Sequence, residues 1–207
     1  MRVIALAQQK GGVGKSTLAI HMAVELAQRG RRVAIIDMDP QGTVTKWASR
    51  RDRTVKPWPI VATSGALNLE AELSALREMH FVFLDMPGKR AADVNLGMRL
   101  ADLVIIPARP LDIDVEASAE TVAAAQRMKK AYAFALTASP PGGKRASEFT
   151  ALMQAKGLPI IPAVITERLA YPDAISEGLG VSEWEPAGKA AAEISVFTTE
   201  VLKELRK

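Results

Sequence analysis

Residues 8–17 read Gln-Gln-Lys-Gly-Gly-Val-Gly-Lys-Ser-Thr, and this glycine-rich stretch decides the fold. An apolar run at residues 3–7 precedes it, and an amphipathic run at residues 18–29 follows it. A strand, a glycine-rich turn and a helix in this order predict a phosphate-binding loop, because glycines let backbone N–H groups approach phosphate oxygens closely. The positive end of the helix dipole at Ser16 adds to this attraction. We therefore expect Lys15 to reach the β- and γ-phosphates and the Ser16 hydroxyl to ligate Mg²⁺.

The loop departs from the general pattern G-x-x-x-x-G-K-[ST] at its first position, where Gln9 stands in place of glycine. A second lysine, Lys10, stands at the front of the loop, and residues 10–17 match K-G-G-x-G-K-[ST]-T throughout. This stretch resembles the deviant Walker A loop of the ParA/MinD family of ATPases. The resemblance implies a nucleotide cradle made of Gly11, Gly12, Val13, Gly14, Lys15, Ser16 and Thr17. The alternative, a glycine-rich corner with two solvated lysines, is less favoured because further motifs agree with the family.

Two predicted strands end in acidic residues. Asp37 and Asp39 follow the apolar run at residues 32–36, and Asp85 ends the run at residues 81–85. The carboxyl ends of parallel strands form the ligand-binding edge of an open α/β sheet. By resemblance, Asp39 orients the attacking water, Asp37 supports Mg²⁺ through a water, and Asp85 is the Walker B residue that holds Mg²⁺ through water. The alternative for the first pair is that it caps the following helix.

Other stretches extend the resemblance to essentially all 207 residues. Residues 86–88 resemble the switch that follows Walker B, and residues 166–183 resemble the matching region of the short, ParF-type members, which neighbours the adenine pocket. Arg168 is a candidate functional residue there, although an exposed or capping arginine is an equal alternative. The motif Asn-Lys-x-Asp of guanine-specific proteins does not occur, which together with the resemblance favours ATP over GTP.

Composition limits the class of protein. The chain has 207 residues, of which 48% are hydrophobic and 24% charged, and this suits one globular α/β domain over residues 1–207. The net charge of +4 permits a nucleic-acid surface without requiring one. The absence of cysteine excludes disulfides, thiolate metal sites and iron–sulfur clusters. Neither a signal peptide nor a transmembrane run is evident, so we expect a cytoplasmic protein.

Apolar runs alternate with helical patterns along the whole chain, which predicts a doubly wound, mostly parallel sheet with helices on both faces, the P-loop NTPase fold. Leucines at 67, 69, 73 and 76 predict an amphipathic helix, and residues 114–130 predict one long helix. Residues 189–207 predict a final helix with an apolar face. We expect that face to pack on the core, the alternative being a membrane anchor.

The resemblance implies a mechanism with ATP and Mg²⁺ as cofactors and with catalytic roles for Lys10, Lys15 and Asp39. Two subunits dimerise on ATP, and Lys10 of each reaches the phosphates held by the other. The dimer then binds non-specific DNA, and a centromere-binding, ParB/ParG-like adaptor accelerates hydrolysis. The expected role is segregation of a plasmid or chromosome by a protein that is nucleoid-associated when ATP-bound.

Candidate DNA contacts form a basic cluster after the acidic pair, although a solvated face is the more favoured alternative; its members are Lys46, Arg50, Arg51, Arg53 and Lys56. Three other functions stay open. A MinD-like ATPase would act on a membrane surface, which we do not expect here. Relatives that distribute protein clusters or microcompartments share the DNA-based mechanism and cannot be separated from a segregator by sequence alone. A metabolic P-loop enzyme would need a substrate motif that we do not find.

Overall fold

The computed structural model describes residues 1–52, 54–56, 58–63, 66–88 and 91–206. These residues form one seven-stranded sheet in the order β3-β2-β4-β1-β5-β6-β7, and every recorded strand pair is parallel. The predicted fold class is confirmed, and "mostly parallel" becomes all-parallel. The strands are β1 (Arg2–Leu6), β2 (Val33–Asp37), β3 (Ile60–Thr63), β4 (Phe81–Asp85), β5 (Leu103–Ala108), β6 (Tyr132–Ser139) and β7 (Ile160–Thr166).

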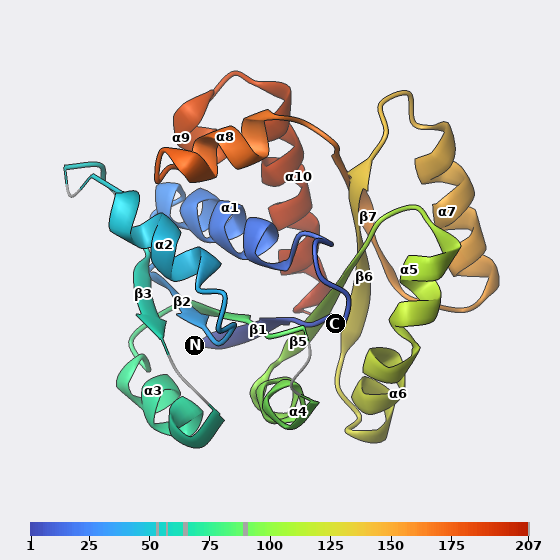
Figure 1. Cartoon of the computed structure of the whole chain (residues 1–207), viewed down its shortest axis with the longest axis horizontal. Coiled ribbons are helices and arrows are strands. Elements are labelled where there is room, and N and C mark those ends of the chain that lie inside the picture. The colour runs from blue at the N-terminus through green and yellow to red at the C-terminus, as the bar shows by residue number, and fades with distance from the viewer. Residues whose placement is uncertain (53, 57, 64–65, 89–90, 207) are drawn as a thin grey trace.

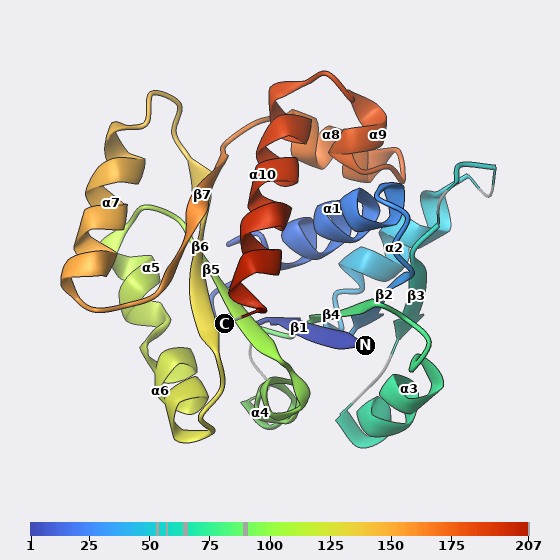
Figure 2. The ribbon, with the colours of Figure 1, turned by 180° about the vertical axis from the view of Figure 1, so that it is seen from behind.

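Helices cover both faces of the sheet (Figures 1 and 2). One face carries α1 (Lys15–Gln28), α2 (Thr43–Arg50), α8 (Ala170–Ser176), α9 (Val181–Trp184) and α10 (Lys189–Glu204). The other carries η1 (Ala66–Asn68), α3 (Leu69–Ala75), α4 (Ala91–Leu100), α5 (Asp112–Ala117), α6 (Ala119–Arg127) and α7 (Lys144–Ala155). Because side chains alternate along a strand, Ile4 and Leu6 join the first core while Val3 and Ala5 join the second.

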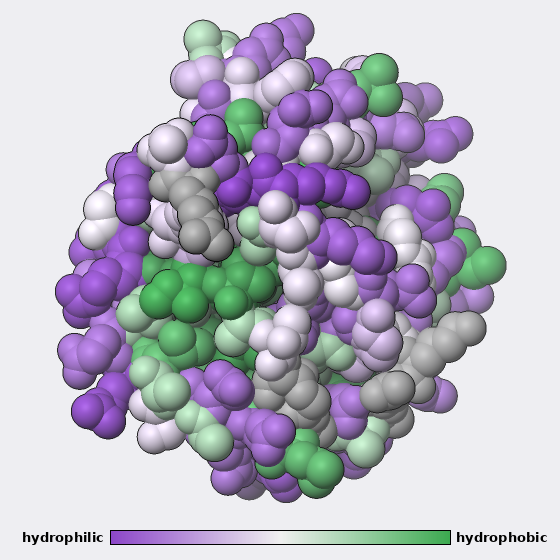
Figure 3. Space-filling model, turned by 60° about the vertical axis from the view of Figure 1, so that its left-hand side comes forward, coloured by the Kyte–Doolittle hydropathy of each residue, from purple (hydrophilic) through white to green (hydrophobic). Residues whose placement is uncertain are grey.

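Strand β3 forms one edge of the sheet. Its recorded partner is β2, and Ile60 is 45% exposed. Figure 3 brings this side of the molecule forward and shows an apolar patch bordered by polar side chains.

Two helix predictions need correction. The single helix expected over residues 114–130 is wrong, because α5 and α6 meet at Ser118, whose hydroxyl donates to the Val115 carbonyl at 2.5 Å. A serine side chain that binds nearby backbone competes with the regular helix ladder. The helix expected to include Leu67 begins only at Leu69, and Leu67 is fully exposed. The leucine spacing therefore predicted α3 but extended it too far at its start.

The final helix packs on the core, as expected. Ile194, Phe197 and Val201 are fully buried, and Leu202 and Leu205 pack against the same cluster. The apolar face that would anchor a membrane helix is thus covered by α1 and β7. No helix within the described residues is both long and apolar enough to span a bilayer.

Candidate functional site

The glycine-rich loop joins β1 to α1 at the carboxyl edge of the sheet. Gly12 and Gly14 have φ values of 71° and 97°, a left-handed backbone that glycine adopts without steric cost. Lys15 is 7% exposed, and its Nζ donates to the Lys10 carbonyl at 3.3 Å. Burial lowers the pKa of Lys15, and the carboxylates of Asp85 and Asp39 oppose that shift. The ammonium group therefore lies inside the loop, close to both acidic strand ends.

The ends of β2 and β4 lie side by side next to this loop. Asp37 and Asp85 are paired in the sheet register, and the Ser16 hydroxyl donates to Asp85 Oδ2 at 2.6 Å. Asp85 is completely buried, and burial raises its pKa to about 7. Among the described residues, its Oδ1 has no hydrogen-bond partner. A buried carboxylate oxygen beside a hydroxyl is a hard, oxygen-only donor set, which fits Mg²⁺.

The two carboxylates that follow β2 have different surroundings. Asp37 Oδ2 accepts hydrogen bonds from the backbone N–H and the hydroxyl of Thr45, both at 2.8 Å. Asp37 therefore holds the first turn of α2, as the capping alternative expected. Asp39 is half-buried, and its Oδ1 accepts from the Gln41 N–H at 2.9 Å in a tight turn. Within the described ranges no three acidic, histidine or cysteine side chains form a ready metal cage. A magnesium ion here would thus take water and phosphate oxygens as well.

The loop after β4 lies against the phosphate-binding loop. A Cβ built on Gly88 would stand 3.0 Å from the Gln9 carbonyl oxygen and 3.8 Å from Lys15 Nζ. Only glycine therefore fits this approach without displacing a neighbour. The residues predicted as a switch therefore lie directly against the glycine-rich loop and Lys15.

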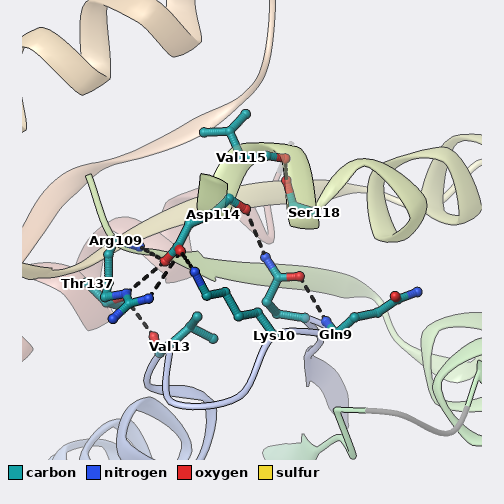
Figure 4. Close-up of polar contacts among 9 residues, drawn as sticks. Gln9, Lys10, Val13, Arg109, Asp114, Val115, Ser118 and Thr137 are labelled. Atoms are coloured by element: carbon teal, nitrogen blue, oxygen red, sulfur yellow. Dashed lines mark hydrogen bonds and ion pairs between the residues drawn. The ribbon is translucent and has the colours of Figure 1, made fainter. Parts of the chain in front are cut away.

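Lys10 binds within its own chain. Its Nζ contacts Asp114 Oδ1 on α5, and Arg109 Nε donates to the other oxygen of the same carboxylate at 2.9 Å (Figure 4). Sequence reasoning placed Lys10 at the phosphates of a second subunit, and it missed both Asp114 and the arginine that shares this carboxylate. No local signal marks them, because Asp114 follows Lys10 by 104 positions.

A cavity of about 730 Å³ lies beside the loop, between the end of β6 and α8. Its walls include Thr137, Ala138, Leu169 and Pro172. Thr137 Oγ1 donates to the Val13 carbonyl at 2.8 Å, so β6 also supports the phosphate loop. The cavity borders the region whose resemblance indicated an adenine pocket. Sequence reasoning missed Thr137 and Ala138, and the positive φ of Ala138, 44°, is invisible in the sequence.

Arg168 also lines this cavity, but its guanidinium is paired with Glu193 Oε1 at 2.6 Å. The hydroxyl of Tyr171 donates to the other oxygen of that carboxylate at 3.0 Å. Arg168 thus links β7 and α8 to α10 through this ion pair, and it is half-buried rather than exposed.

One member of the basic cluster is not a surface residue. Arg51 is 4% exposed, donates to Glu183 Oε2 at 2.7 Å and lies 5.4 Å from the centre of the Trp47 ring. Its place among candidate DNA contacts is therefore wrong. Lys46, Arg50 and Lys56 are exposed, and Arg53 lies outside the described residues.

Comparison with known proteins agrees with this geometry. Residues 4–181 match the model of the CobQ/CobB/MinD/ParA nucleotide binding domain. The chain is 31% identical to the maintenance of carboxysome distribution protein A of Gloeobacter kilaueensis, over 99% of this chain and 94% of that protein. It is also 31% identical to protein ParA of Rhizobium radiobacter, over 83% of this chain and 81% of that one.

Solved structures show the same fold. The septum site-determining protein MinD of Pyrococcus horikoshii, solved in complex with Mg-ADP, superposes with a TM-score of 0.77 at 18% identity, over 97% of this chain and 95% of that one. From the match over residues 4–181 and the loop, strand ends and cavity described above, the chain belongs to the CobQ/CobB/MinD/ParA nucleotide-binding family and is an ATPase of the ParA/MinD type.

Proposed function

We propose that this protein is a positioning ATPase that distributes a protein cluster of the carboxysome kind over DNA. The observation that carries the proposal is the likeness to a carboxysome distribution protein over 99% of this chain and 94% of that relative. Motif resemblance alone had favoured plasmid partition. This likeness spans 99% of this chain and 94% of that relative, whereas the motifs cover only the nucleotide site.

The roles of the site residues form part of this proposal. The backbone of residues 11–17 and the Lys15 ammonium hold the phosphates of ATP, and the Ser16 hydroxyl ligates Mg²⁺. Asp85, buried with one oxygen unpartnered, holds the ion through water. Asp39 orients the attacking water, since it is half-buried, its charge acts on Lys15 in the loop, and its side chain accepts only from the turn at Gln41 among the described residues. Mg²⁺ supplies charge neutralisation at the phosphates when bound.

Dimerisation on ATP and non-specific DNA binding complete the proposal. Lys10 of one protomer would reach the phosphates of its partner, as the family resemblance implies. Exposed Lys46, Arg50 and Lys56 are candidate phosphate contacts on DNA. Two copies of such a patch bind more DNA phosphates than one, so ATP switches binding on. The packing of α10 on the core argues against a membrane surface as the matrix.

Binding to random-sequence DNA tests this proposal. It is measured with ATP, ADP or no nucleotide, at low salt and at higher salt, with liposome sedimentation in parallel. Binding that requires ATP and weakens steeply with salt supports the proposal. Loss of binding in Lys15→Ala, with Lys144→Ala at an exposed position of α7 as the control, links DNA binding to the nucleotide site. Absence of DNA binding in all three states, or binding to liposomes, contradicts it.

A second candidate function is plasmid or chromosome partition with a ParB/ParG-like centromere-binding adaptor. The 31% identity to protein ParA of Rhizobium radiobacter supports it. Deletion of the gene in its own cell separates the two functions. Clustering of a protein assembly after deletion, with unchanged plasmid and chromosome inheritance, supports cluster positioning. Loss of inheritance with an unchanged distribution of protein assemblies supports partition.

A further inference from the structure

The carboxylate of Asp114 is fully buried, and two cationic side chains from different parts of the chain bind it (Figure 4). Lys10 comes from the phosphate-binding loop, and Arg109 comes from the loop after β5. The side chains of Lys10 and Arg109 are 26% and 34% exposed, so both reach solvent while their common partner does not. Burial alone would raise the pKa of Asp114, but the hydrogen bonds from Arg109 and Lys10 outweigh it and lower the pKa. The carboxylate is therefore charged at neutral pH and needs a partner.

The two cations bind this carboxylate unequally. Arg109 donates its backbone N–H and Nε to Asp114 Oδ2, at 3.1 and 2.9 Å, and a terminal nitrogen to Oδ1 at 3.3 Å. Lys10 contributes one contact, to Oδ1. If Lys10 leaves, Asp114 keeps its bonds to Arg109. If the Arg109 side chain were removed, Lys10 would be the one side-chain cation that the described structure places on this buried charge, and its departure would become costly.

Neighbouring residues fasten the same part of the loop to α5 and α6. The side-chain amide of Gln8 donates to the Asp114 carbonyl at 3.4 Å. Gln9 Nε2 donates to Glu120 Oε2 at 2.5 Å. Gln9 is the residue that replaces the expected glycine of the general loop pattern. The front of the loop is thus restrained by contacts to α5 and α6, and Lys10 is the charged member of that set.

We infer that Arg109 is a positioning residue that sets how readily Lys10 leaves Asp114 for a nucleotide. With Lys10 on Asp114, the loop rests in a closed arrangement within one chain. When Lys10 leaves, Arg109 takes over the whole carboxylate, which stays buried and paired. The resting half of this inference stands on the contacts alone, whereas the destination of Lys10 rests on the proposed function.

Chemical labelling of Lys10 in the nucleotide-free protein tests the resting half. An amine-reactive reagent is followed by mass spectrometry, with exposed Lys144 as the internal reference. Asp114→Asn raises the labelling rate of Lys10 about tenfold, because it removes a charge-assisted bond. Arg109→Gln lowers the rate severalfold, and the double variant labels like Asp114→Asn. Asp112→Asn and Arg145→Gln are the controls, because each removes the same charge as one test variant but at an exposed position. Both leave the labelling rate of Lys10 unchanged. An unchanged rate in Asp114→Asn overturns the inference.

The midpoint of ATP-dependent dimerisation, measured by light scattering without DNA, tests the other half. Asp114→Asn lowers the ATP concentration at this midpoint several-fold, and Arg109→Gln raises it. The double variant has the same midpoint as Asp114→Asn. If these residues only stabilised the fold, the midpoint would rise in both single variants and in the double variant. If Arg109→Gln does not fold, Arg109→Lys replaces it, because lysine keeps the charge but lacks the several N–H donors of the guanidinium group. Arg109→Lys then gives a smaller rise in the midpoint. The inference is overturned if the midpoint shifts in the same direction in both single variants. A third result is the expected labelling pattern with no ATP-dependent dimer in the natural protein or in any variant. This result overturns the proposed function and leaves the Lys10–Asp114 contact supported.

Discussion

The buried carboxyl of Asp85 makes the stability of the nucleotide-free protein depend on pH. Burial raises its pKa from 3.8 to about 7 against the opposing hydrogen bond from Ser16, and the nearby charge of Asp37 raises it further. Between the two values, the folded protein holds a proton that the unfolded chain has released. The stability contributed by this group is therefore fully present below about pH 4. It is lost as the pH rises through about 7.

The size of the effect follows from the shift. Each pKa unit corresponds to about 1.4 kcal/mol. Between pH 5 and pH 7, the free energy of unfolding falls by about 2 kcal/mol through this one group, and it changes little above pH 8. Asp85→Asn removes the titration while keeping the shape of the side chain and an oxygen that accepts from Ser16. The difference in unfolding free energy between the natural protein and the variant should thus change by about 3 kcal/mol from pH 5 to pH 8, with the natural protein gaining toward acid.

Urea unfolding at pH 5, 6, 7 and 8, with chelator and without nucleotide, measures this difference directly. Subtracting the curve of the variant cancels the other titrating groups. Asp112→Asn on the exposed start of α5 serves as control, and its difference from the natural protein should stay constant over this range. A constant difference for Asp85→Asn as well would refute the reasoning, because it would mean that Asp85 does not titrate near pH 7.

Three further predictions concern other parts of the chain. Lys15→Ala lowers ATP affinity roughly a hundredfold in titration calorimetry, because it removes a charged donor inside the loop; an unchanged affinity would place the phosphates elsewhere. Gly178→Ala brings a methyl group 2.6 Å from the Arg51 backbone nitrogen, so urea unfolding should show a loss of more than about 1 kcal/mol. Gly30→Ala, with a similar φ but open space, is the matched control and should cost less. Leu67→Ser, at a fully exposed position, changes stability by less than about 0.5 kcal/mol.

Local patterns predicted the scaffold of the site well. The run at residues 81–85 became β4 with Asp85 at its end, and the helix expected from Ser16 begins one residue earlier, at Lys15. These features depend on neighbours in sequence: an apolar run, a glycine that accepts positive φ, and a helix that follows at once. Parallel pairing then brings strand ends together whatever the loops between them contain. The register that places Asp37 beside Asp85 follows from this rule.

Cargo identity could not be predicted in the same way. The loop, the acidic pair and Asp85 all serve the nucleotide, and ATPases that move different cargoes need the same chemistry there. Residues that contact cargo lie on the surface, where they leave no local pattern. The basic cluster illustrates the difficulty, since composition grouped Arg51 with Arg50. The fold buries Arg51 against Glu183 and leaves Arg50 exposed.

Lys10 shows why a motif predicts chemistry better than position. The spacing K-G-G-x-G-K-[ST]-T marks a lysine that is able to reach a phosphate, and the flexible backbone around Gly11 and Gly12 permits that reach. Where the ammonium rests without nucleotide depends on which anion lies nearest. That anion is Asp114, which the sheet order brings alongside because β5 is the neighbour of β1. Burial of a carboxylate has a desolvation cost that close cations offset, so Asp114 competes for Lys10 with any phosphate that Lys10 is able to reach. The resting position of Lys10 is therefore a property of the whole sheet.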